Sequence, residues 1–296
     1  MRLTKGWFSQ IKEKNCFLTD FFVYLPCMKK SVFLLLLFVL VWAGTETLFA
    51  QSVSDTRAEQ LVEVESGGAT RRALLFLPDA PVPSGGAPLV FVFHGRSGTM
   101  EGAAKRMPMH DHWREAIVVY PQGMWVEGGL RDGFGWVMPT ADDEGRDIAF
   151  FDVLLAEIAK RYSVDLQRVY AMGHSNGGGF THALWAVRGE CIAAVAPSAS
   201  GAGNLRGLAE QQPPKPAFFV AGEADDIVPL WRVQKSIERT LAVNGCRKGK
   251  KISNHHTLYR GADGADVESY IHPGGHKFNR ESLPLIARFF ARHKRD

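Results

Sequence analysis

Cysteine is scarce in this sequence, and the few cysteines do not form a metal-binding pattern. Only four occur among 296 residues, with no C-x-x-C pair and no histidine/cysteine cluster at zinc-ligand spacing. Cys16 and Cys27 fall in a predicted leader, which leaves Cys191 and Cys246. Export would permit a disulfide between these two, although two unpaired residues fit the sequence equally well. We therefore predict no metal site and no cofactor.

Blocks of basic residues are lacking as well. The formal net charge is +4, but residues 1–50 hold six of the 35 basic and three of the 31 acidic residues. The rest of the chain therefore has 29 basic and 28 acidic residues, and its net charge is close to zero. No run of lysine or arginine indicates a nucleic-acid surface, and the terminal Arg292–Arg295 segment is typical of a solvated helix end. Nucleic acid is therefore not an expected partner.

No apolar run is long enough for a membrane span. Residues 32–44 form a run of 13, whereas a span needs about 20. This run follows the basic start Met28-Lys29-Lys30 and precedes small and polar residues up to Ala50, the order of a signal peptide. An uncleaved anchor is the alternative. We interpret residues 1–27 as a wrongly extended start and 28–50 as a signal peptide. We expect one domain over 51–296, secreted or periplasmic, with no membrane partner.

Apolar strand-like runs and helical periodicity alternate along the rest of the chain. The expected strands are 61–65, 72–77, 88–93, 116–120, 168–172, 191–196, 216–220 and 267–271, and the expected helices are 147–162, about 178–187, 231–243 and 282–292. Continuous apolar strands indicate a sheet covered on both faces. The alternation predicts a mostly parallel α/β sheet with the first two strands as an antiparallel hairpin at its edge.

The sequence Gly173-His174-Ser175-Asn176-Gly177 fits the G-x-S-x-G pattern. The pattern alone is weak, but here it lies directly between an apolar strand and a helix, the setting of a nucleophile elbow. A sharp strand-to-helix turn strains the serine backbone and leaves no room for flanking side chains, so glycines are required. Ser175 is therefore the predicted nucleophile, with a structural turn as the alternative. His174 is expected to point away from Ser175 and to pack.

A serine nucleophile needs a base and an orienting acid, which follow it in this fold in the order acid, then histidine. Past the strand 216–220 the chain enters an acidic turn in which Asp225 and Asp226 are competing candidates and Glu223 is a weaker one. The residues themselves leave that choice open. A solvated acidic turn is the alternative interpretation.

His276 is the candidate base among ten histidines, because it follows the last strand on the glycine-rich segment Pro273-Gly274-Gly275. His272, which ends that strand, is expected to be structural. The oxyanion hole needs two N–H donors. We expect one from the amide of Asn176 and the other from Arg96, in the His94-Gly95-Arg96 segment, with Gly95 as the alternative.

From about residue 69 onward the chain resembles the secreted poly(3-hydroxybutyrate) depolymerase and feruloyl esterase family of α/β-hydrolases. The matching segments are Phe93–Gly95, Val119–Gly123, Asp147–Phe150, Arg168–Tyr170, Gly173–Gly178, Ala221–Pro229 and Gly274–His276. The resemblance implies the α/β-hydrolase fold. The family's G-x-x-D-x-x-V-P pattern falls on Gly222, Asp225, Val228 and Pro229, which implies Asp225 as the acid.

The chain also departs from the family. Lys277-Phe278-Asn279 stands where members often have an aromatic residue and a proline after the catalytic histidine. No cysteine lies between Cys246 and His276, so the disulfide that the family often forms there is ruled out. The long loop 122–146, which carries Trp125 and Trp136, differs enough to leave the acyl pocket undetermined, and loops of this length are often functional.

These features predict a secreted serine carboxylic-ester hydrolase that acts through an acyl-enzyme. Trp125, Trp136 and Trp231 are candidate aromatic walls for the acyl group, or else pack in the core. Only 20 residues follow His276, too few for a polymer-binding domain, which favours soluble short or aromatic (feruloyl or acetyl) esters. The alternatives are a polyhydroxybutyrate depolymerase, a serine peptidase and a non-catalytic binding protein of the same fold. The expected partner is a small-molecule or oligomeric ester. Oligomeric state is not predicted.

Overall fold

The computed structural model describes residues 59–128, 131–140, 143, 145–205 and 207–295, all of which belong to one compact unit. The predicted leader over 1–27 and 28–50, with its cleavage after Ala50, lies outside the described residues. None of the helices in the described ranges is both long and apolar enough to cross a membrane.

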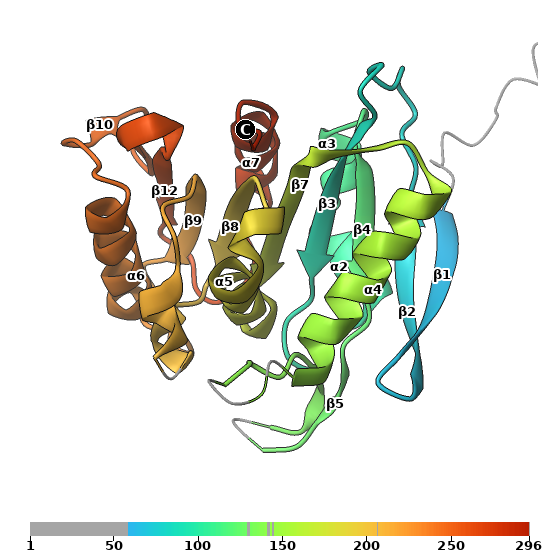
Figure 1. Cartoon of the computed structure of the whole chain (residues 1–296). Helices are drawn as coiled ribbons and strands as arrows, with labels where there is room; N and C mark the ends of the chain where they lie inside the picture. Colours follow the sequence, from blue (N-terminus) through green and yellow to red (C-terminus); the bar gives the residue numbers. More distant parts are fainter. Residues whose placement is uncertain (1–58, 129–130, 141–142, 144, 206, 296) are drawn as a thin grey trace, which may run out of the picture. The chain divides into compact units, whose positions relative to one another are not determined.

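Ten strands of the described residues form one twisted sheet (Figure 1) in the order β1-β2-β4-β3-β7-β8-β9-β12-β11-β10. The strands are β1 Glu59–Ser66, β2 Ala69–Phe76, β3 Ala87–Phe93, β4 Ile117–Pro121, β7 Val164–His174, β8 Ala194–Ser198, β9 Ala217–Gly222, β10 Lys250–Lys251, β11 His256–Tyr259 and β12 Val267–His272. The six central strands, from β4 to β12, run parallel. The predicted mostly parallel sheet is therefore confirmed, with the β1–β2 hairpin as an antiparallel edge.

Helices cover both faces of this sheet. One face carries α4 Gly145–Arg161, α5 Asn176–Arg188 and α6 Leu230–Val243, and the other carries α2 Met100–Arg106, α3 Met109–His112 and α7 Leu283–Ala291. Each central strand contributes alternate side chains to the two cores: in β3, Phe91 and Phe93 join the first core, while Val90 and Val92 join the second. This two-sided burial explains why the strands are continuous apolar runs.

Several elements differ from the sequence expectations. The strand expected over 191–196 begins only at Ala194, because Gly189–Cys191 forms a 3-10 turn. The loop 122–146 contains a two-stranded antiparallel ribbon, β5 Met124–Val126 and β6 Gly133–Gly135. The strands β10 and β11, which form a second antiparallel edge, and the short helices α2 and α3 were not expected. They are too short and too polar to show a clear period.

Cys191 and Cys246 are both free and only partly buried. Burial raises the pKa of each thiol, and nearby carboxylates raise it further, Glu190 at Cys191 and Asp266 at Cys246. The unpaired alternative of the two sequence interpretations is therefore the one that the structure shows.

Candidate active site

A sharp turn between β7 and α5 carries the serine of the G-x-S-x-G sequence. Ser175 has backbone angles φ 57° and ψ −117°, in the positive-φ region that residues with side chains rarely adopt. A Cβ on Gly173 would lie 2.4 Å from the carbonyl oxygen of Gly177, and a Cβ on Gly177 would lie 2.2 Å from that of Phe93. The two glycines are thus sterically required, and the turn holds Ser175 at the carboxyl edge of the parallel strands.

Ser175, His276 and Asp225 form a continuous hydrogen-bonded row. His276 Nε2 lies 2.8 Å from Ser175 Oγ, and His276 Nδ1 lies 2.8 Å from Asp225 Oδ2. Asp225 is buried, and its Oδ1 also accepts the amide N–H groups of Ile227 at 3.0 Å and Val228 at 2.8 Å. An ionised carboxylate can only accept, so the His276 proton resides on Nδ1. Nε2 is then free to accept the serine proton.

The acid and histidine turns are joined to each other through their backbones. β9 and β12 are neighbouring parallel strands, with Gly222 opposite His272. Just past their ends, the amide of Glu223 donates to the His272 carbonyl at 2.8 Å, and the amide of Ala224 donates to the Gly274 carbonyl at 3.1 Å. A Cβ on Gly222 would lie 2.3 Å from the Gly274 oxygen. This close approach brings together Asp225 and His276, which are 51 residues apart.

The other candidates near the acid and the base have different surroundings. Glu223 and Asp226 are exposed, unlike Asp225. His272 is buried, and its Nδ1 accepts the amide N–H of Gly274 at 3.1 Å, which matches its expected structural role. Burial is the main cause that lowers the pKa of His272, and the nearby His255 lowers it by a smaller amount.

His174 packs, as expected, but it packs against the candidate base itself. Its ring centroid lies 5.0 Å from that of His276 and 5.8 Å from that of Phe278, and its Nδ1 lies 3.1 Å from Ser198 Oγ. Burial among these rings and, to a smaller extent, the neighbouring His276 lower the pKa of His174 to about 4. A neutral imidazole therefore supports one side of the His276 ring. No pattern in the sequence indicates this contact.

The two amides expected to form an oxyanion hole lie at the end of β3 and the start of α5. Gly95 approaches the serine closely, since a Cβ on it would lie 3.5 Å from Ser175 Cβ. No acceptor among the described residues takes a hydrogen bond from the amide N–H of Arg96 or Asn176. Both N–H groups are therefore available at the turn that carries Ser175.

The three tryptophans proposed as aromatic walls have different environments. Trp136 is only 1% exposed, and its ring lies 5.1 Å from Phe93 and 5.0 Å from Phe180. A ring enclosed in this way offers no surface to a substrate, so the prediction for Trp136 is corrected: it packs the core. Trp125 and Trp231 are 53% and 52% exposed and stay candidates.

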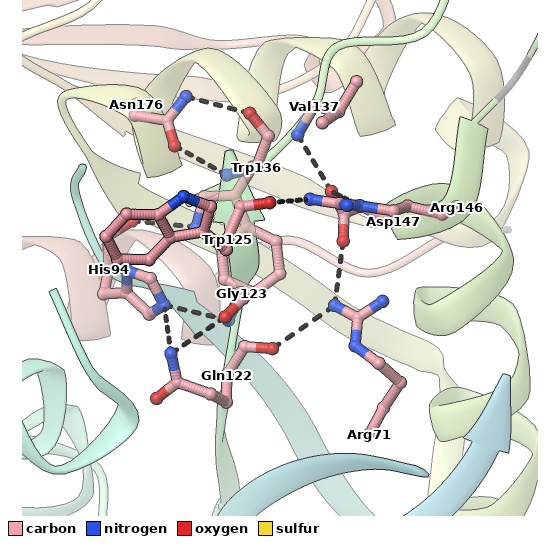
Figure 2. A network of polar contacts seen from close by, with 10 residues as sticks. All are labelled: Arg71, His94, Gln122, Gly123, Trp125, Trp136, Val137, Arg146, Asp147 and Asn176. Carbon is pink, nitrogen blue, oxygen red and sulfur yellow. Dashed lines mark hydrogen bonds and ion pairs between the residues drawn. The ribbon is translucent and has the colours of Figure 1, made fainter. Parts of the chain in front are cut away.

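The buried face of the loop 122–146 is a polar network centred on Trp136 (Figure 2). Trp136 Nε1 donates to the His94 carbonyl at 2.8 Å, its amide donates to Asn176 Oδ1 at 2.7 Å, and its carbonyl accepts from Asn176 Nδ2 at 3.0 Å. The amide of Gly123 donates to His94 Nε2 at 2.9 Å. The loop therefore holds residues on both sides of the expected oxyanion hole.

No group of three or more histidine, cysteine or acidic side chains within the described ranges could hold a metal ion.

Comparison with known sequences gives relatives named as esterases. The chain is 26% identical over 241 residues to feruloyl esterase D of Neurospora crassa, covering 74% of this chain and 78% of that protein. It is 29% identical over 191 residues to the bifunctional acetylxylan esterase/xylanase XynS20E of Neocallimastix patriciarum, covering 62% of this chain but only 25% of that protein. No protein-family model matches the chain.

Comparison with solved structures gives the same fold. An acetyl xylan esterase from Aspergillus awamori superposes with a TM-score of 0.60 at 16% identity, covering 78% of this chain and 99% of that one. A ferulic acid esterase superposes with a TM-score of 0.54 at 18% identity, covering 79% of this chain and all of that one. These structures confirm the predicted α/β-hydrolase fold, and the sequence relatives confirm the resemblance to feruloyl esterases and the esterase class.

Proposed function

We propose that this chain, an esterase of the α/β-hydrolase fold, hydrolyses carboxylic esters through a covalent acyl-enzyme on Ser175. One observation carries the proposal: the row in which Ser175 Oγ and His276 Nε2 lie 2.8 Å apart while His276 Nδ1 contacts the buried Asp225 carboxylate. A nucleophile, a base and an orienting acid within hydrogen-bond reach are what acyl transfer requires.

The reaction follows from this arrangement in two halves. Ser175 Oγ attacks the ester carbonyl while its proton passes to His276 Nε2, and the amides of Asn176 and Arg96 stabilise the oxyanion. His276 then returns the proton to the departing alcohol, which leaves an acyl group on the serine. In the second half, water gives a proton to His276 and attacks the acyl carbon, releasing the acid and restoring Ser175. Asp225 holds the imidazole orientation throughout.

The nucleophile is tested by replacing its hydroxyl. We expect Ser175→Ala to lower kcat on p-nitrophenyl acetate by about 10⁶-fold, as for other triad nucleophiles, with the unfolding midpoint unchanged. A fluorophosphonate probe should label the wild type and not the variant. Ser253→Ala, at an exposed serine, is the matched control and should behave as the wild type. Labelling that persists in Ser175→Ala would place the nucleophile elsewhere, and a folded but unlabelled wild type would favour a non-catalytic binding protein.

The proposed substrates are soluble short or aromatic esters, of the feruloyl and acetyl type found on plant polysaccharide fragments. The names of the relatives support this class. The exposed Trp125 also lies across β5–β6 from the exposed Phe134, with ring centroids 5.6 Å apart. Such a surface pair suits contact with a planar group. Trp231, at the start of α6 after the acid turn, is also exposed.

The substrate class is tested by comparing kcat/KM on methyl ferulate, p-nitrophenyl acetate, a soluble hydroxybutyrate oligomer and a peptide amide. We expect the aryl and acetyl esters to be turned over fastest. Clearing of a polyhydroxybutyrate suspension with negligible turnover of the two small esters would assign the protein as a depolymerase, and preferred amide cleavage would assign it as a peptidase.

Export is proposed on the order of residues 28–50 alone, a basic start followed by a 13-residue apolar run and small residues. Expression with these residues intact should deliver a protein outside the cytoplasm whose N-terminus lies near Gln51. A full-length chain retained inside the cell would contradict it.

A further inference from the structure

A buried ion pair closes the base of the loop that lines the proposed oxyanion hole. Arg71, on β2, lies 2.8 Å from Asp147 at the start of α4, and the two residues are 3% and 0% exposed. The Arg71 guanidinium also lies over the Phe150 ring, 4.0 Å from its centroid. The sequence places Asp147 at the beginning of a helix and in a segment that matches the family, and it assigns the side chain no role.

Each partner of this pair also holds one end of the loop segment 122–137, through a backbone group of that segment (Figure 2). Arg71 donates to the carbonyl of Gln122 at 3.3 Å, where the loop begins, and the amide of Val137, fifteen positions later in the sequence, donates to Asp147 Oδ2 at 2.8 Å. Arg146, next to Asp147, donates to the Trp125 carbonyl at 2.9 Å. The ion pair therefore fixes the two ends of the segment relative to the sheet.

Between these two ends lie the groups that hold the oxyanion-hole residues. Trp136, adjacent to Val137, makes two hydrogen bonds with the side chain of Asn176 and one with the carbonyl of His94. Gly123, adjacent to Gln122, donates to His94 Nε2. Gly123 directly follows Gln122, whose carbonyl Arg71 holds, and Trp136 directly precedes Val137, whose amide Asp147 holds. A shift of the loop ends would therefore move both sides of the hole.

His94 transmits this positioning to the Arg96 amide. Because Nε2 accepts from Gly123, the ring proton resides on Nδ1, which donates to the Gly95 carbonyl at 2.8 Å. In a planar trans peptide the C=O and the following N–H point in opposite directions. Holding the Gly95 carbonyl against His94 therefore directs the Arg96 N–H away from that ring. Burial lowers the pKa of His94, which favours the neutral tautomer that this arrangement needs.

We propose that Asp147 and Arg71 are positioning residues that set the geometry of the oxyanion hole from outside the active site, through the ends of the segment 122–137. The inference rests on the proposed ester hydrolysis. Neither side chain touches the reacting atoms. A buried ion pair is often replaceable by apolar side chains without loss of stability, so the role assigned to this pair is the placement of backbone groups rather than stabilisation of the fold.

The test replaces the pair by apolar side chains of similar size. In Arg71→Met/Asp147→Leu we expect kcat on p-nitrophenyl acetate to fall by roughly 10²-fold, the scale of a misplacement of about 1 Å in an active site, with KM changed less than about threefold. The inhibition constant of a trifluoromethyl ketone, whose adduct with serine carries an oxyanion, should rise in parallel with the loss of kcat/KM. Fluorophosphonate labelling at Ser175 should persist at a reduced rate.

The matched control is Asp152→Leu/Arg188→Met, which removes a second ion pair of α4, at 2.9 Å and partly exposed. It should leave kcat and the inhibition constant as in the wild type. A folded Arg71→Met/Asp147→Leu variant with kcat and inhibition constant within about threefold of wild type would overturn the inference while leaving the proposed function intact. An inactive, unlabelled wild type would instead refute the proposed function.

If the double variant does not fold, Trp136→Phe decides the matter. It keeps the ion pair and an aromatic ring in the core, and it removes the N–H that binds the His94 carbonyl together with part of the indole ring. We expect kcat to fall by roughly tenfold, which is less than the loss caused by removing one oxyanion-hole donor outright. KM should stay unchanged, and the inhibition constant of the trifluoromethyl ketone should rise by the same factor as kcat falls. Unchanged kcat and ketone binding would show that the loop does not position the hole and would refute the proposal.

Discussion

At the scale of single residues, hydrogen-bond partners distinguish side chains that look equivalent in the sequence. Asp225 and Asp226 are adjacent acids in one turn, yet only Asp225 is buried, and its two oxygens together receive two backbone amides and the His276 ring. Asp226 points to solvent. Fixed in this way, the Asp225 carboxylate can hold one imidazole tautomer, which a solvated carboxylate cannot do.

This difference predicts unequal effects for two conservative variants. Asp225→Asn should lower kcat by up to about 10⁴-fold, because an amide at that position favours the wrong imidazole tautomer. Asp226→Asn should change kcat less than about twofold. Steady-state kinetics on p-nitrophenyl acetate, with far-UV circular dichroism to verify folding, measures both. The reverse ranking would show that the acid had been assigned one residue out of place.

At the scale of elements, the β7–α5 turn depends on how closely the helix approaches the sheet. The first turn of α5 lies against the end of β3, where a Cβ on Gly177 would meet the carbonyl oxygens of Phe93 and His94 at 2.2 and 2.6 Å. Both obstacles are backbone atoms, so neither can rotate away. Gly179, two residues later in the same helix, has Met138 Cε at 3.4 Å as its nearest neighbour.

Alanine at these two glycines should therefore have opposite effects. Gly177→Ala should destabilise the protein by about 1–3 kcal/mol through overpacking and should lower kcat, because α5 carries the Asn176 amide. Gly179→Ala should be neutral or stabilise by up to about 1 kcal/mol, since alanine is the better helix former. Urea unfolding gives both free energies. Equal stabilities would mean that the approach of α5 to β3 is looser than the structure shows.

At the scale of the whole molecule, packing on both faces of the sheet buries titratable groups as well as apolar ones. His182, on α5, is fully buried beside Trp185 and Phe219, and its Nδ1 accepts from Gln212 Nε2 at 3.2 Å. Burial lowers the pKa of His182 to about 4, below the value of about 6.5 expected for the unfolded chain.

This shift predicts that the fold weakens in acid. Between pH 6.5 and 4 the unfolded chain binds a proton at His182 that the folded chain does not, so the free energy of unfolding falls as the pH falls, by up to about 1.4 kcal/mol per pH unit. Above pH 6.5 this contribution is fully present. Urea unfolding of His182→Leu at several pH values should give a shallower acid slope than the wild type. Identical slopes would assign the acid sensitivity to other groups.

Local patterns in the sequence were sufficient for much of the fold. The two-sided apolar runs predicted the parallel strands, and the G-x-S-x-G turn predicted an elbow whose glycines are sterically required. The edge strands β10 and β11 and the β5–β6 ribbon were missed, because strands of two to four residues are too short to show a period. Whether Trp136 packs in the core or faces a substrate was left open for a related reason: a loop residue gives no pattern from which to infer which way its ring points.

By itself, then, the sequence determined what depends on near neighbours: where strands and helices alternate, which serine occupies the strained turn, and the order in which acid and histidine follow it. Tertiary structure decided what depends on contacts across the sheet. It left Cys191 and Cys246 unpaired, brought Asp225 rather than Asp226 to His276, and joined Arg71 to Asp147 across 76 positions. Strand order and helix approach set these contacts, because a side chain's partner and burial are fixed only when distant segments pack together.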